Sequence, residues 1–279
     1  ESGEDSAREV VQMYRMGSPP MRKVFKGTIR PLVVFSPQDV DLAQGAPTWR
    51  RRFLDTLLMS VDARYLRQWR QYQHVLLQRN HALKEPKLWE TADSFAPLLQ
   101  ESGWYLWQRR DWLLKRLVPR AQDIHDRLSG GEHLELHHVY GGSSEAVASE
   151  AVYQTIWQRR QADERQRGMT LVGPHRDDMV LLLNGHPATH YASQGQMRTI
   201  ALSLKLASYA VLRDCLGHDP LVLLDDVLSE LDDTRRRALL QLMTQAHQQT
   251  LVTDTEARAY ENLSAWIYRV KAGEIDRNA

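Results

Sequence analysis

Short apolar runs alternate with helical stripes in the C-terminal part of the chain. Residues 221–224 are four apolar residues in a row, a pattern that predicts a short buried strand. Further strands are predicted at residues 169–172, 179–183 and 250–252. The alternation of strands and helices over residues 169–255 is typical of a βαβ arrangement with a parallel sheet.

Hairpins and isolated strands are predicted elsewhere. Asn184-Gly185 is the strongest two-residue hairpin signal, and it follows the strand predicted at 179–183. An apolar run at 32–35 predicts a buried strand, and alternation at 134–140 predicts another. A final hairpin is expected around Ala272-Gly273.

The middle of the chain has the apolar spacing of helices. Pro47 stands near the first position of one helix, and a second helix runs from about Asp62 until Pro86 ends it. Two or three more helices are expected over residues 88–128. Another is expected from about residue 145 to the terminator Gly168.

These elements predict an α/β fold that carries an inserted, mainly helical subdomain. We expect three parts: residues 1–46, the helical insertion 47–168, and the C-terminal part 169–279. A long helix should begin at Ser193 and close at Gly217, directly before the apolar run at 221–224.

Composition narrows the class of protein. A single cysteine, Cys215, excludes an internal disulfide framework and a cysteine-based zinc site, which fits a reducing cytoplasm. No apolar run approaches the roughly 18 residues of a membrane span, so no membrane role is expected. Residues 1–120 hold 20 Lys and Arg against 13 Asp and Glu. This basic part is either a surface for a polyanion or the solvated face of long helices.

Two segments carry candidate chemistry. Asp225 and Asp226 directly follow the buried run, where two carboxylates at the edge of a core favour a bound cation. This pattern indicates a magnesium–nucleotide site of the Walker B kind, or a strand that simply ends in a polar turn. Ser193-Gln194-Gly195-Gln196 opens the long helix, where free N–H groups favour phosphate, although a serine at this place is usually only an N-cap.

In this order, the two segments and the Ser-Glu-Leu-Asp sequence that ends at Asp232 resemble an ABC-type ATPase head. More narrowly, the chain resembles the RecF family of bacterial recombination mediators, which is related to the SMC proteins. The resemblance rests on Phe35-Ser-Pro-Gln-Asp39, Arg51-Arg-Phe-Leu-Asp55, Gln78-Arg-Asn80, Gly173-Pro-His-Arg-Asp-Asp178, Ser193-Gln-Gly-Gln196 and Leu223-Leu-Asp-Asp-Val-Leu-Ser-Glu-Leu-Asp232. It implies a P-loop NTPase-like sheet, here incomplete.

The resemblance implies roles for individual residues. Asp225 would hold Mg²⁺ through water, and Asp226 would orient the attacking water during ATP hydrolysis. Thr253 stands where ABC proteins carry a switch histidine. The remaining implied nucleotide contacts, in part with the nucleotide bound to the other subunit of a dimer, are Ser193, Gly195, Gln196, Asp232 and the Q-loop candidate Gln38.

Partners also follow from the resemblance. It implies an ATP-dependent homodimer that binds double-stranded DNA and junctions of single-stranded with double-stranded DNA. It also implies work with other recombination mediator proteins in loading recombinase on gapped DNA, a link to the SOS response, and a cytoplasmic, nucleoid-associated protein. Charge density alone nominates DNA contacts at Arg50, Arg51, Arg52, Arg67 and Arg70. Arg51 and Arg52 fall in a family-like segment and are alternatively packing residues.

One departure from the family pattern concerns ATP itself. No glycine in the 279 residues is followed by lysine, so the P-loop motif is not in this sequence. The start at Glu1 rather than Met agrees with a truncated chain, and we expect poor ATP binding and negligible hydrolysis by this chain alone. The alternative hypothesis is a non-catalytic adaptor that keeps an ABC-like fold in order to bind DNA or protein.

Overall fold

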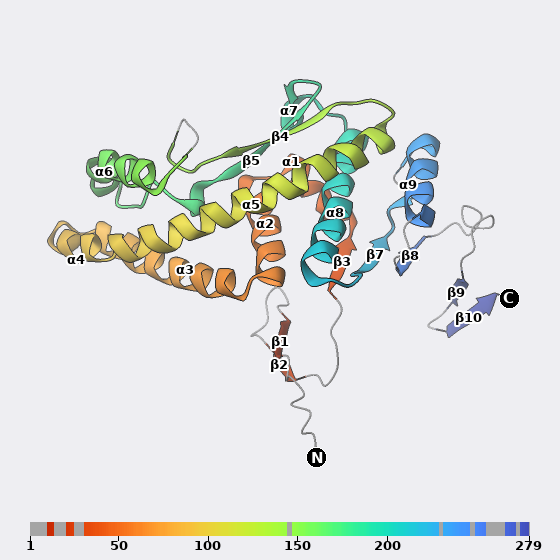
Figure 1. The fold of residues 1–279 in the computed structure, drawn as a ribbon, viewed down its shortest axis with the longest axis horizontal. Helices are drawn as coiled ribbons and strands as arrows, with labels where there is room; N and C mark the ends of the chain where they lie inside the picture. The colour runs from red at the N-terminus through yellow and green to blue at the C-terminus, as the bar shows by residue number, and fades with distance from the viewer. Residues whose placement is uncertain are drawn as a thin grey trace, which may run out of the picture.

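A three-stranded parallel sheet lies at one end of the molecule (Figure 1). The computed structural model describes residues 10–13, 21–24, 31–143, 147–228, 231–245, 249–254, 266–271 and 274–278. The sheet consists of β3 (Leu32–Phe35), β7 (Leu221–Asp225) and β8 (Thr250–Thr253), in the order β3-β7-β8. The predictions of strands at 32–35, 221–224 and 250–252 are therefore confirmed.

The two faces of this sheet differ in burial. Val33, Val222 and Leu224 point into the core, whereas Leu32 is 52% exposed and Leu251 is 50% exposed. This difference follows the period of two along each strand. Helix α9 (Asp233–Gln245) connects β7 to β8, so these elements form the predicted βαβ unit.

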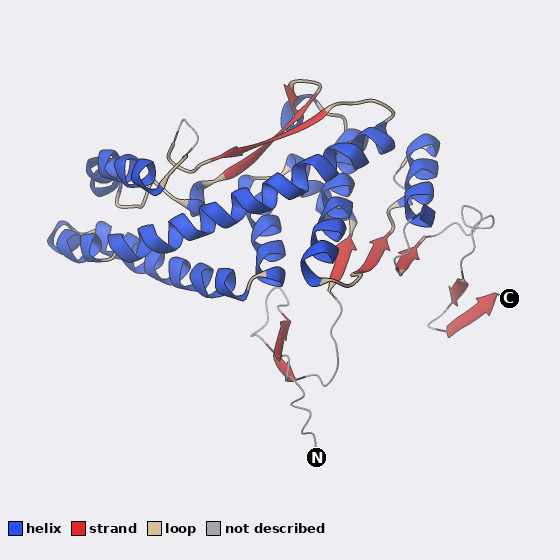
Figure 2. Cartoon of the chain, viewed as in Figure 1, coloured by secondary structure: helices blue, strands red, loops and turns tan. Residues whose placement is uncertain are grey.

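Helices fill most of the remaining described chain (Figure 2). Helix α2 begins at Pro47, and Asp62 caps α3 by accepting the backbone N–H groups of Arg64 and Tyr65. Gly168 ends α6 with a φ of 63°, as predicted. The helices before β4 and after it are α1 (Asp41–Gln44), α2 (Pro47–Val61), α3 (Ala63–Leu83), α4 (Trp89–Ser94), α5 (Ala96–Ser129) and α6 (Glu150–Arg167).

One helix boundary differs from expectation. The stretch expected to hold two or three helices contains two, the short α4 and then α5, a continuous helix of 34 residues, so that prediction is confirmed. Helix α6 begins at Glu150 rather than near residue 145, because the side chain of Ser149 accepts the N–H of Val152 and caps the helix there. Helix α5 runs across the long axis of the molecule and packs along α8 (Gln194–Leu216) (Figure 1).

A second sheet is antiparallel. It contains β4 (Leu134–Val139), β5 (Asp178–Leu183) and β6 (His186–Pro187). Asn184 and Gly185 turn between β5 and β6 with φ values of 51° and 78°, as the hairpin signal predicts. Strand β5 therefore pairs with β4 and not with the parallel sheet, so the expected βαβ alternation over residues 169–255 is wrong before residue 221.

The strand predicted at residues 169–172 is also absent from the described structure. The backbone N–H of Thr170 binds the side chain of Asn80, and that of Leu171 binds the carboxylate of Glu164. Side chains from two helices thus satisfy donors that a strand would use, and the segment forms a loop. These bonds join it to α3 and α6.

Shorter elements complete the chain. β1 (Val10–Met13) pairs with β2 (Met21–Val24), and β9 (Ile267–Lys271) pairs with β10 (Glu274–Asn278) as the predicted final hairpin. Single turns occur at η1 (Pro37–Val40), η2 (Pro86–Leu88), η3 (Pro174–Arg176) and α7 (Ala188–Tyr191). Among the helices that the structure describes, none is both long and apolar enough to cross a membrane.

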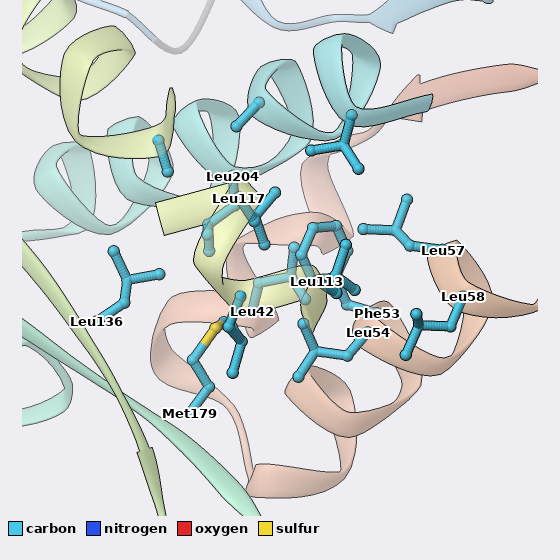
Figure 3. Close-up of a cluster of buried hydrophobic side chains, with 14 of the residues drawn as sticks. Leu42, Phe53, Leu54, Leu57, Leu58, Leu113, Leu117, Leu136, Met179 and Leu204 are labelled. Atoms are coloured by element: carbon cyan, nitrogen blue, oxygen red, sulfur yellow. The ribbon is translucent and has the colours of Figure 1, made fainter. Parts of the chain in front are cut away.

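One apolar core joins the helices to both sheets. Figure 3 shows its central part, where Leu42, Phe53 and Leu54 of α1 and α2 meet Leu113 of α5 and Met179 of β5. The core continues to α8 and to the parallel sheet. Burial of these side chains supplies the main favourable free energy of folding.

A buried polar network runs beside this core. The guanidinium of Arg110 lies between two carboxylates, with Nη2 2.7 Å from Asp55 and Nη1 2.7 Å from Asp177. Asp177 also accepts hydrogen bonds from the indole N–H of Trp107 and the backbone N–H of Gly141. All four lone-pair directions of this buried carboxylate can thus be used, which is the condition for burying a charge.

The network sets the charge states of its members. Burial alone would raise the pKa of Asp177, but the hydrogen bond from His138 and the charge of Arg110 hold it below its usual value. Burial alone would lower the pKa of His138, but hydrogen bonds to Asp111 and Asp177 raise it. Asp177 is therefore ionised, and His138 takes up a proton more readily than a free histidine.

We expect Asp177→Asn to lower the free energy of unfolding by about 3–5 kcal/mol, because it leaves the buried charge of Arg110 without one of its two partners. Urea denaturation followed by circular dichroism measures the change. Asp163→Asn is the control, because Asp163 pairs with Arg160 on the surface and should change stability by less than about 0.5 kcal/mol. Equal effects of the two variants would contradict a special role for the network.

Two other histidines should make the fold sensitive to acid. Burial lowers the pKa of His125 and of His175 to about 4, compared with 6.5 in an unfolded chain. Between these values only the unfolded chain binds the protons, so stability should fall as the pH falls from 6.5 to 4. In His125→Gln the slope of unfolding free energy against pH should decrease by about 1.4 kcal/mol per pH unit in this window. A slope in His125→Gln equal to that of the parent protein would contradict this assignment.

Candidate functional site

The carboxyl ends of the parallel strands form one polar edge. Asp225 is the last residue of β7 and pairs in register with Thr253 of β8. The hydroxyl of Thr253 donates to Asp225 Oδ1 at 2.6 Å and accepts the backbone N–H of Asp226 at 3.1 Å. Thr253 therefore fixes the direction of one carboxylate and the backbone of the next residue.

Asp226 has an unusual backbone conformation. Its φ is +51°, in the left-handed region that non-glycine residues rarely adopt. The nitrogen of the Asp226 N–H also lies 3.2 Å from the carbonyl oxygen of Thr253. Thr253 of β8 therefore offers this N–H two acceptors, its hydroxyl and its carbonyl oxygen. At this turn Asp225 is exposed to solvent and Asp226 is half-buried.

The donor set fits one kind of cation. Among the described residues, no three His, Cys, Asp or Glu side chains converge on a common point. Mg²⁺ fits this edge, because it binds through one or two carboxylates and takes its other ligands from water and substrate phosphates.

The segment after β3 lies beside this edge. Phe35 and Leu224 are paired in register, so β3 and β7 end together. Gln38 lies exposed in η1, and the carboxylate of Asp39 binds Lys205 of α8 at 2.8 Å. A small pocket between these parts is lined by Phe35, Pro37, Arg198, Leu202, Val227 and Leu231. The structure thus brings together the segment of Gln38, the start of α8 and the loop after Asp226.

The start of α8 is a complete capping box. Ser193 Oγ accepts the N–H of Gln196 at 3.3 Å, and Gln196 Oε1 accepts the N–H of Ser193 at 2.7 Å. Ser193 is exposed, and the amide of Gln196 donates to Glu132 Oε1 at 2.8 Å. The N-cap interpretation of Ser193 is therefore confirmed, while its contact with phosphate stays a prediction.

The start of α9 lies next to the start of α8. Asp232 caps α9, with Oδ1 accepting the N–H groups of Thr234 and Arg235 at 3.0 and 2.9 Å. The guanidinium of Arg235 lies 3.3 Å from the Glu132 oxygen that Gln196 also binds. Ser229 and Glu230 begin the Ser-Glu-Leu-Asp sequence that ends at Asp232, and they lie outside the described residues.

Two residues of the site, Glu132 and Arg235, were not identified as functional from the sequence. They connect the two helix starts, while Thr253, noted at the position of the switch histidine, orients Asp225. Arg235 carries a local signal, because it stands three residues after the cap Asp232. Glu132 carries no local signal, because its partners are 64 and 103 residues away in the chain.

The arginines nominated for DNA occupy different surroundings. Arg50 is only 4% exposed, with Nε and Nη2 on Asp178 and Nη1 near the carbonyls of Leu42 and Gly45. The expectation that Arg50 contacts DNA does not fit this burial. Arg51 donates to the carbonyl of Asp177, which favours the packing alternative for it. The other three candidates, Arg52, Arg67 and Arg70, are exposed.

The comparisons with known proteins agree on one family. The chain is 40% identical over 261 residues to the DNA replication and repair protein RecF of Cyanothece sp. (strain PCC 7425 / ATCC 29141), covering 87% of this chain and 67% of that protein. It is also 40% identical over 261 residues to the protein of the same name from Halalkalibacterium halodurans, covering 88% and 69%. No protein-family model matches the chain.

Solved structures agree with the relatives. The recombination mediator protein RecF-ATPrS in the RecFOR pathway superimposes with a TM-score of 0.78 at 28% identity, covering 97% of this chain and 76% of that one. The corresponding RecF-ATP structure gives a TM-score of 0.76 at 27% identity, covering 95% and 74%. The predicted α/β fold of an ABC-type ATPase head is therefore confirmed.

We expect Thr253→Val to loosen the carboxylate edge without unfolding the sheet. Loss of the hydroxyl removes its bonds to Asp225 and Asp226, so exchange of the Asp226 amide hydrogen should accelerate about tenfold. Hydrogen exchange followed by NMR measures this rate. Thr250→Val on the same strand is the matched control, because the buried Thr250 hydroxyl has no hydrogen-bond partner in the described structure. An unchanged Asp226 rate in Thr253→Val would show that the hydroxyl does not hold the turn.

Proposed function

The chain belongs to the RecF family of DNA replication and repair proteins, and on that premise we propose that it acts as an ATP-gated dimer that binds DNA. The observation that supports this proposal is the carboxyl edge of the parallel sheet, where the Thr253 hydroxyl binds the carboxylate of Asp225 and the backbone N–H of Asp226. The start of α8 lies in the same head and presents an exposed Ser193. These two features provide the two halves of a composite nucleotide site.

The carboxylate edge is the proposed half for hydrolysis. Asp225 would hold Mg²⁺ through water, with the Thr253 hydroxyl keeping its carboxylate in position. Bound Mg²⁺ would spread the charge that develops on the transferred phosphoryl group. Asp226 would orient the attacking water or accept its proton, and the turn imposed by its positive φ keeps it distinct from Asp225. Gln38 would contact the same region from η1.

The start of α8 is the proposed half for dimerisation. Ser193, Gly195 and Gln196 would contact the γ-phosphate of ATP bound to the partner subunit, because the first turn of a helix offers N–H groups and the positive end of its dipole. Asp232 would lie across the same interface. ATP would then join two heads, and its hydrolysis would release them.

DNA binding is the proposed output of this dimer. Arg52, Arg67 and Arg70 are exposed on α2 and α3, where they would contact phosphates without reading sequence. We propose binding to double-stranded DNA and to junctions of single-stranded with double-stranded DNA. Together with other recombination mediators, the protein would help to load recombinase on gapped DNA in the nucleoid, including during the SOS response.

The proposed domains follow the same logic. Residues 1–46 and 169–279 would form the ATPase lobes, and residues 47–168 would form the helical insertion. Direct pairing of β3 with β7 supports this proposal, because the two strands are neighbours in one sheet although the 185 residues 36–220 lie between them in the chain. Pairing of β4 with β5 connects the insertion to the C-terminal lobe.

Two variants test the composite site in an extended chain, defined as this sequence joined at its N-terminus to the P-loop segment of a RecF relative. Asp226→Asn should preserve the ATP-bound dimer and lower turnover on the order of a hundredfold, because only the group that positions water is lost. Ser193→Arg should prevent the dimer, because the larger side chain would occupy the space proposed for the γ-phosphate of the ATP bound to the partner subunit. Light scattering with and without ATP reports mass, and phosphate release reports turnover.

Asp233→Asn is the control for these variants, because Asp233 is exposed at the start of α9 and is not among the proposed nucleotide contacts. If Asp226→Asn and Ser193→Arg both leave turnover and DNA binding unchanged, the non-catalytic adaptor alternative is favoured instead.

A further inference from the structure

Arg235 lies directly over the backbone at the start of α8. A Cβ atom added to Gly195 would be 3.1 Å from Arg235 Nη1, so the guanidinium covers the face of the helix turn where that glycine has no side chain. The Arg235 side chain is 16% exposed, and Nη1 also lies 3.5 Å from Asp232 Oδ2. One cation thus lies between Ser193-Gln194-Gly195-Gln196 and Asp232, the two groups of proposed nucleotide contacts on the partner-facing side.

Glu132 holds this cation in place. Its Oε1 lies 3.3 Å from Arg235 Nη2 and 2.8 Å from the amide nitrogen of Gln196. His125 lies near the second oxygen of the same carboxylate, with Nε2 3.6 Å from Glu132 Oε2. Burial lowers the pKa of His125 to about 4, so the histidine is neutral at physiological pH and Arg235 is the counter-ion of Glu132.

We propose that Arg235 is a nucleotide-binding residue, which contacts a phosphate of the ATP bound to the partner subunit, and that Glu132 is the residue that positions it. The proposal rests on the proposed function, because it deepens the same composite site. Any phosphate that approaches the N–H groups around Gly195 comes within reach of the guanidinium. Arginine suits this role, since its planar group binds phosphate through two nitrogens and stays charged.

The arrangement also explains why the cation is held before a nucleotide arrives. An arginine that is already ordered by two carboxylates loses little side-chain entropy when it binds phosphate. Asp232 directly precedes α9, and Glu132 lies in the loop between α5 and β4. The Arg235 side chain keeps 16% of its surface exposed, and we expect a phosphate to reach it there without displacing either carboxylate.

The test measures the ATP concentration that gives half-maximal dimer in the extended chain, followed by light scattering. Arg235→Gln should raise this concentration on the order of ten- to a hundredfold, because a charge-assisted hydrogen bond to phosphate is lost. Arg235→Lys should show a smaller rise, because the charge remains. Arg237→Gln is the matched control on the same helix, since Arg237 is exposed and donates to the backbone carbonyl of Asp233 in its own helix. It should leave the ATP concentration for half-maximal dimer unchanged.

A charge exchange separates phosphate contact from simple packing. The double variant Glu132→Arg with Arg235→Glu keeps an ion pair between the two positions but places a carboxylate over Gly195. We expect its melting temperature to recover relative to Arg235→Gln, while ATP-dependent dimerisation stays lost. Recovery of dimerisation together with stability would overturn the proposal, because the pair would then be only structural.

Ser193→Arg separates a failure of the role proposed for Arg235 from a failure of the composite nucleotide site. If Ser193→Arg prevents the dimer while Arg235→Gln dimerises at the parent's ATP concentration, the inference about Arg235 fails and the composite site stands. If Ser193→Arg also dimerises like the parent, the composite site fails, and the role of Arg235 fails with it.

Discussion

The ion pairs of Arg110 with Asp55 and Asp177 are the constraint on which the arrangement of the helices depends. A buried guanidinium costs several kcal/mol unless its partners are correctly placed. Asp55 comes from α2, Arg110 from α5, and Asp177 from the loop that leads into β5. All three segments must therefore adopt one relative position, and the apolar core around Leu113 and Met179 then fills the space between them.

Several of the segments that carry the family resemblance serve in this framework. Arg50 binds Asp178, Asn80 binds the backbone of Thr170, and Arg79 binds Glu164 at 2.7 Å in a fully buried pair. Asp225 and Ser193 belong to other resembling segments and are the residues proposed to act on the nucleotide. In contrast to the buried ion pairs, they are exposed at the ends of elements. A sequence resemblance can therefore identify this fold through its buried ion pairs, even where the chemistry is supplied by few side chains.

Local signals in the sequence predicted the elements that local forces determine. Three elements appear where expected because neighbouring residues alone determine them. They are the strand before Asp225, the helix capped by Asp62 and the turn at Asn184-Gly185. The strand expected at residues 169–172 failed because Asn80 and Glu164, distant in sequence or on another element, satisfy its backbone. In the candidate site, Asp225 and Ser193 were visible as an acidic strand end and a helix start. Glu132 was not, because only the packing of α5 against α8 and α9 gives it partners.

Gly195 shows how the start of α8 combines access with rigidity. A glycine within a helix costs roughly 1 kcal/mol relative to alanine, since it has more conformational freedom to lose. The reciprocal bonds of Ser193 and Gln196 offset that cost at the same turn. The first turn of α8 therefore keeps a fixed geometry although it contains a glycine, and a ligand that docks there meets amides whose directions are already set by folding.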